Sequence, residues 1–169
     1  MKCSEICALI EQEYGTEYAC DWDNVGLLAG RSTKEVKKIL LSLDATDEVV
    51  RMAVEGGYDM LITHHPMLFS AIKRVTDQDM NGRRLLELIH NDISYYAMHT
   101  NYDTRGMADL AARLMGLTEC AVLEEVKDGE GIGRVGKLPH PMTLRECGEQ
   151  VKVAYGIPNV RLFGDPDTQ

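Results

Sequence analysis

Two adjacent histidines, His64 and His65, are the residues whose type and spacing point most directly to chemistry. They follow the short apolar run of residues 60–63. His99 and Asp103 follow a second apolar run, residues 93–98, which comes after a predicted helix. Imidazole and carboxylate groups suit zinc, manganese, iron or cobalt better than magnesium or calcium. Adjacent side chains on an extended backbone point apart, so the two histidines are expected to hold two neighbouring ions. The pattern predicts ligands of a two-metal site.

Asp103 is the candidate for the group that bridges the two ions, because the two oxygens of a carboxylate suit their separation of about 3.5–4 Å. Such a centre activates a bound water, which indicates hydrolysis of an ester, amide, phosphate or ring amidine. His99 is the predicted catalytic acid or base; the alternatives are that it orients a ligand or is a buried structural histidine. Asp44 is expected to orient a ligand or to begin a turn rather than to touch a metal.

Alternating strand and helix patterns predict the elements that position these residues. The predicted strands span residues 38–43, 60–63 and 93–98, and the predicted helices span 4–14, 47–55, 82–90 and 107–115, with Ser4 and Thr46 as N-caps. This order predicts an α/β fold, a mostly parallel sheet flanked by helices with right-handed crossovers. In such a sheet, ligands bind at the carboxyl ends of the strands, where all the candidate residues fall.

A second unit is predicted to begin where the composition changes after Val126. Residues 127–136 are rich in glycine and charge, which is typical of a linker or a hairpin. A capping box from Thr143 to Glu146 predicts a helix, and a strand is predicted over residues 159–163. We therefore divide the chain into a metal-site domain, residues 1–126, and an incomplete second α/β unit, residues 127–169.

Composition limits the possible partners. The formal net charge of -9 disfavours general binding to nucleic acid. No apolar run approaches the roughly 18 residues that cross a bilayer, and the N-terminus lacks the basic start of a signal peptide. We expect a cytoplasmic protein with a small-molecule substrate and no membrane or nucleic-acid partner.

Other residues leave alternatives open. Lys73 and Arg74 follow the histidine pair on a long loop, where they either meet an anionic substrate or are solvated surface charges. Trp22, the single tryptophan, either stacks on a ring or packs against the fold. Cys3 and Cys7 share a helix face, which favours a place in the core over a metal or redox pair.

Four motifs in order carry a family resemblance: DWDNVGL from Asp21, LDAT from Leu43, ITHHP from Ile62 and HTNYD from His99. The sequence resembles the Nif-like dinuclear metal-centre family, also called GTP cyclohydrolase I type 2. The resemblance implies metal ligation by His64, His65 and a bridging Asp103. It also implies a ring-shaped hexamer, two interleaved α/β units, and ring-opening of GTP or another nucleotide-like substrate.

The sequence departs from that pattern in one respect. The family supplies a further histidine and glutamate beyond the position of Gln169, and no histidine follows His140 here. We expect a chain shortened by cloning, proteolysis or the gene, with two divalent ions in the complete protein and weak or absent metal in this one. A metal-dependent hydrolase is the favoured function, ahead of a non-catalytic regulatory or assembly protein and of a plain structural domain.

Overall fold

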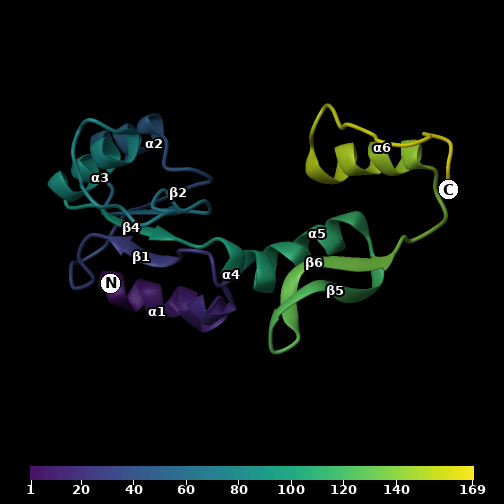
Figure 1. Cartoon of the computed structure of the whole chain (residues 1–169), viewed down its shortest axis with the longest axis horizontal. Coiled ribbons are helices and arrows are strands. Elements are labelled where there is room, and N and C mark those ends of the chain that lie inside the picture. Colours follow the sequence, from purple (N-terminus) through teal and green to yellow (C-terminus); the bar gives the residue numbers. More distant parts are fainter. The chain divides into compact units, whose positions relative to one another are not determined.

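The computed structural model describes all 169 residues, which form two compact units, Met1–Arg105 and Gly106–Gln169 (Figure 1). The first unit contains α1 (Cys3–Glu13), a 3-10 turn η1 (Thr16–Tyr18), β1 (Gly26–Ala29), β2 (Ile39–Ser42), α2 (Asp47–Glu55), β3 (Met60–Thr63), α3 (Met80–His90), β4 (Ser94–Ala97) and α4 (Thr100–Tyr102). The π-helical turn η2 (Asp103–Met107) follows α4. The second unit contains α5 (Ala108–Met115), β5 (Thr118–Lys127), β6 (Glu130–Lys137) and α6 (Leu144–Tyr155).

A four-stranded sheet with the order β1-β4-β3-β2 is the centre of the first unit. β3 pairs in parallel with both β2 and β4, whereas β1 pairs antiparallel with β4 at one edge. The predicted fold class, a mostly parallel sheet flanked by helices, is confirmed. Because the three parallel strands are joined through helices, their carboxyl ends meet at one edge of the sheet.

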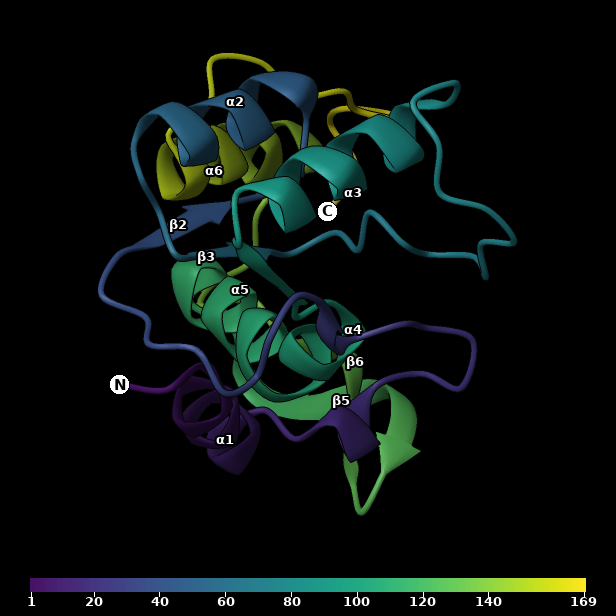
Figure 2. The ribbon, with the colours of Figure 1, turned by 90° about the vertical axis from the view of Figure 1, so that its left-hand side faces the viewer.

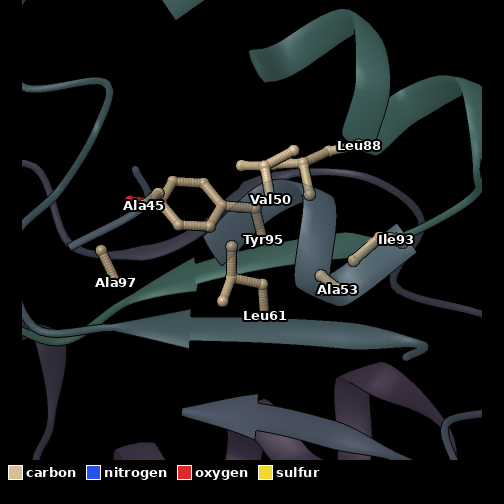
Figure 3. Close-up of a cluster of buried hydrophobic side chains, with 8 residues drawn as sticks. All are labelled: Ala45, Val50, Ala53, Leu61, Leu88, Ile93, Tyr95 and Ala97. Carbon is tan, nitrogen blue, oxygen red and sulfur yellow. The ribbon is translucent and has the colours of Figure 1, made fainter. Parts of the chain in front are cut away.

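Helices cover both faces of this sheet: α2 and α3 lie on one face and α1 on the other (Figures 1 and 2). Under α2 and α3, the side chains of Leu61 and Tyr95 pack against Val50, Ala53 and Leu88 (Figure 3). Under α1, the buried cluster includes Cys3, Cys7, Met60, Ile62 and Tyr96. The two cysteines are therefore core residues, and burial raises the pKa of the Cys7 thiol to about 12.

The edge strand β2 differs from the prediction of a buried strand. Its residues are alternately exposed and half-buried, and 71% of Leu41 is accessible to solvent. Leu40 packs on the cluster beneath α2 and α3, whereas Leu41 points to the face on which α1 lies. An unbroken apolar run cannot distinguish an edge strand from a central one, because the sequence does not specify which strands have two neighbours.

Capping residues explain where the helices begin. Thr46 caps α2 as predicted, since its side chain accepts a hydrogen bond from Val49 N. Asp79 caps α3, so this helix begins two residues before the predicted start. Ser4 is not the cap of α1; the Glu5 side chain instead accepts a hydrogen bond from Lys2 N, 2.8 Å away.

The second unit is built on the β5–β6 hairpin, against which α5 packs. Asp128 and Gly129 both have positive φ, as the tight turn of a two-residue hairpin requires. The capping box at Thr143 is confirmed, but residues 159–163 form no strand, because no neighbouring strand pairs with them. The compact units divide between Arg105 and Gly106, because α5 packs with the hairpin that follows it. The division into a metal-site domain and an incomplete second unit after Val126 stays a prediction.

No helix of the chain combines the length and the apolar character that crossing a membrane requires.

Replacing Leu61 with Ala tests the core beneath α2 and α3. Leu61 is fully buried, so we expect Leu61→Ala to lower the free energy of unfolding by about 2–5 kcal/mol, measured by urea denaturation. Leu41→Ala, on the neighbouring strand but exposed, is the matched control and should change the free energy by less than about 0.5 kcal/mol. Equal effects of the two substitutions would contradict the assigned packing.

Candidate metal centre

Three histidines gather at the carboxyl edge of the sheet. One ring nitrogen from each of His64, His65 and His99 lies within 4.8 Å of the others. Their ring centroids are 5.0 to 5.6 Å apart. His64 and His65 leave the end of β3, and His99 follows β4, so the parallel pairing of these strands brings the three rings together.

The two adjacent histidines converge, contrary to the expectation that they point apart. Strand geometry ends at Thr63, and the backbone bends at both His64 and His65. Alternation of side chains applies only to extended backbone, so the bend removes it. Both rings can therefore contribute to one cluster.

Nδ1 of each ring lies within hydrogen-bond distance of a different oxygen acceptor. His64 Nδ1 lies 3.0 Å from the carbonyl oxygen of Met98. His65 Nδ1 lies 2.8 Å from Asp44 Oδ1, and His99 Nδ1 lies 3.1 Å from both carboxylate oxygens of Asp23. A carbonyl or carboxylate oxygen accepts, so each Nδ1 carries the proton and donates it. In the neutral imidazole, each Nε2 then has its lone pair free, which is the form of histidine that binds a metal ion.

Asp103 lies beside the first of these rings, with Oδ1 3.5 Å from His64 Nε2. Two ligands bound to one tetrahedral ion at about 2.0–2.1 Å each are about 3.3 Å apart, so this pair already has a suitable separation. Burial raises the pKa of Asp103, and the neighbouring histidines partly oppose that shift. The first turn of a π-helical segment carries this carboxylate, a rare conformation that is frequent at functional sites.

Asp23 lies in the site, although the sequence did not identify it as a site residue. Its side chain is fully buried and accepts hydrogen bonds from Thr100 N and Thr100 Oγ1 as well as from His99. Burial by itself would raise the pKa of Asp23, but the hydrogen bonds from Thr100 and His99 outweigh it and hold the pKa below its ordinary value. The only signal in the sequence was the polar run around Trp22, which does not reveal which residue it contacts.

A buried hydroxyl network fixes the turn that carries the histidine pair. The Tyr95 hydroxyl accepts a hydrogen bond from Met67 N at 2.7 Å and lies 2.9 Å from Thr63 Oγ1. Thr63 Oγ1 in turn donates to the carbonyl oxygen of His65 at 2.8 Å. Burial raises the pKa of Tyr95, which keeps its hydroxyl protonated. This network links β3, β4 and the start of the following loop.

The remaining predicted residues have clear places. Asp44 contacts His65 rather than the cluster centre, as expected for a residue that orients a ligand. Lys73 and Arg74 are exposed on the loop between β3 and α3. Trp22 is 59% exposed, which contradicts the interpretation that it packs within the fold.

Comparison with known proteins assigns the family. A profile of the Duf34/NIF3 (NGG1p interacting factor 3) family matches residues 1–169. The chain belongs to the Duf34/NIF3 family. It is similar to proteins named "GTP cyclohydrolase 1 type 2 homolog" from Clostridium perfringens, with 37% identity over 98% of this chain, and Clostridium acetobutylicum, with 35% identity over 99%. The chain spans 64% of the length of each of these two relatives.

Several solved structures have the same fold. Reduced HcgD from Methanocaldococcus jannaschii is 35% identical, with a TM-score of 0.81 over 90% of this chain and 60% of that one. A hypothetical protein from Staphylococcus aureus is 28% identical, with a TM-score of 0.86 over 99% of this chain and 68% of that one. A Bacillus cereus protein related to NIF3 shares the fold at 22% identity and a TM-score of 0.90, over 99% of this chain and 74% of that one.

Substituting Tyr95 with Phe tests the network behind the histidine pair. The change removes the partner of Met67 N and Thr63 Oγ1, so we expect a loss of about 1–3 kcal/mol in the free energy of unfolding. We also expect shifts in the backbone amide resonances of His65 and Met67. Tyr96→Phe is the matched control, since the Tyr96 hydroxyl makes one bond, to Glu11 at 3.3 Å on the opposite face. Unchanged amide resonances of His65 and Met67 would contradict the role of Tyr95 in fixing this turn.

Proposed function

We propose that His64, His65 and Asp103 bind divalent metal ions and that the site hydrolyses a small, nucleotide-like molecule. The observation that carries this proposal is that an acceptor holds Nδ1 of both His64 and His65, which leaves their Nε2 lone pairs for a metal. Two imidazoles and one carboxylate suit zinc, manganese, iron or cobalt. The donor set therefore fits the two-ion centre that the family resemblance implies.

A bound divalent metal would lower the pKa of a water molecule and so supply a nucleophile near neutral pH. The residues of this chain hold the ligands in place: Asp44 fixes the ring of His65, and the Met98 carbonyl fixes the ring of His64. Such partners keep the imidazole in the metal-binding tautomer and increase its basicity. Asp103, with one oxygen already beside His64, would supply the carboxylate ligand.

His99 acts as the general base in this proposal. Asp23 holds its Nδ1 proton, so Nε2 can accept a proton from the attacking water. The lowered pKa of Asp23 keeps its carboxylate ionised, which stabilises the imidazolium that forms. Ring-opening of GTP, which the names of the relatives suggest, needs a water activated in this manner.

A second candidate function is non-catalytic metal binding for regulation or assembly. It is favoured if His99 is a metal ligand rather than a base. If His99 binds the ion, then His64, His65, His99 and Asp103 form four ligands around one tetrahedral metal. Structural zinc sites have all four positions filled by protein, whereas catalytic sites keep one for water. The role of His99 therefore separates the two functions.

A metal titration of His99→Ala decides between them. The catalytic proposal expects Zn²⁺ affinity within a few-fold of the parent chain and loss of GTP hydrolysis by roughly 10²–10⁴-fold, the usual contribution of a general base. Binding is measured by calorimetry and turnover by product analysis. His64→Ala should abolish both binding and hydrolysis, and His90→Ala, an exposed histidine of α3, should change neither.

A large fall in Zn²⁺ affinity for His99→Ala would support the non-catalytic function instead. No measurable Zn²⁺ binding by the parent chain would agree with the expectation of weak or absent metal and would contradict both proposals for this chain.

We also propose that the protein forms a homo-oligomer, with the hexamer that the family resemblance implies as the expected state. Sedimentation velocity measures this directly, because six chains of 18.9 kDa sediment far ahead of one. A single species of 18.9 kDa at all concentrations would contradict it for this chain.

A further inference from the structure

Two exposed aromatic side chains stand beside the histidine cluster. Trp22 is 59% exposed and Phe69 is 50% exposed, and their ring centroids are 5.9 Å apart. The ring of Trp22 also lies edge-on to His99, with centroids 6.2 Å apart. The chain contains only one tryptophan and two phenylalanines, and two of these three residues meet here. Apolar rings of this size are normally buried, so their exposure at a polar site requires an explanation.

Hydrogen bonds made by neighbouring residues fix the two loops that carry the rings. Asp23, next to Trp22, is bonded to Thr100 and His99. Asn24 Nδ2 donates to the carbonyl oxygen of Leu68, 2.5 Å away and adjacent to Phe69. The two loops are thus tied to each other and to the residue proposed as the base. An aromatic pair fixed in this way loses little conformational entropy when it binds a ligand.

We propose that Trp22 and Phe69 form an aromatic platform that stacks against the planar heterocyclic ring of the substrate. This inference rests on the proposed function, because it states which part of a nucleotide-like substrate lies beside the metal centre. The π-faces of aromatic side chains bind nucleobases without a need for base-specific hydrogen bonds. The platform would hold the ring next to His99.

Charges on the same loop are consistent with this orientation. Lys73 and Arg74 follow Phe69 by four and five residues, are exposed, and form no ion pair within the chain. On a chain with a net charge of -9, two unpaired cations provide a local attraction for the anionic end of a nucleotide. The loop therefore carries Phe69, which would contact the ring, followed by Lys73 and Arg74, which would attract the phosphates.

The fluorescence of Trp22 gives a direct test, since no other tryptophan contributes. In the metal-free 169-residue chain, we expect guanosine to quench this fluorescence in a saturable manner, and ribose, which lacks the ring, to leave it unchanged. Equilibrium dialysis should show that Trp22→Leu weakens guanosine binding roughly 5- to 150-fold, the range for loss of one base stack of about 1–3 kcal/mol. Trp22→Phe should restore most of the affinity, and Phe69→Leu should weaken it.

The controls separate this inference from the proposed function. Phe163→Leu removes an exposed phenylalanine of the second unit and should leave guanosine binding unchanged. Trp22→Leu should leave Zn²⁺ binding unchanged, whereas His64→Ala should abolish Zn²⁺ binding and leave guanosine binding intact. Absent Zn²⁺ binding with normal guanosine binding would defeat the proposed function and support the platform.

Three results would overturn the platform: no saturable binding of guanosine by the parent chain, equal quenching by ribose, or an unchanged affinity in Trp22→Leu. Self-association of the parent chain in the absence of guanosine would also overturn the platform if Trp22→Leu abolishes it in sedimentation velocity. A second copy of the chain would then cover the rings.

Discussion

The parallel pairing of β3 with both of its neighbours is the constraint on which the rest of the site depends. Thr63 is level with Ser42 of β2 and Ala97 of β4, so the three strands end at one line. The backbone amides of His65 and Met98 then bond to Leu43 and Thr63 across that line. Because the strands end together, the segments after β2, β3 and β4 meet at one edge without any loop having to span the sheet.

Polar contacts behind the rings convert this edge into a site with defined chemistry. Every histidine of the cluster donates through Nδ1 to an acceptor of a different element, so the tautomers are fixed by the fold rather than by the ligand. The same contacts cross-link the loops, since Asp23 reaches the segment after β4 and Asn24 reaches the segment after β3. Fixed loops explain how exposed aromatic rings can be held at the site without being buried.

The ambiguity between a catalytic and a structural metal site is therefore concentrated in one imidazole. With His99 as a base, His64, His65 and Asp103 would leave coordination positions for water; with His99 as a ligand, the four groups would fill the shell of one tetrahedral ion. Asp23 serves both functions, because a carboxylate on Nδ1 both orients a metal ligand and stabilises an imidazolium. Family membership does not distinguish them, since a fold can carry either function.

The sequence by itself determined the three parallel strands and the helices between them, the fold class, and the placement of His64, His65, His99 and Asp103 after strand ends, because hydrophobic periodicity and end residues are local properties. It determined the cap at Thr46 and the capping box at Thr143 for the same reason. Only the tertiary structure decided that β2 is an edge strand, that residues 159–163 form no strand, and that adjacent histidine rings converge. It alone also brought Asp23 to His99 and Phe69 to Trp22, because contacts between residues tens of positions apart depend on strand order and loop paths that no local pattern specifies.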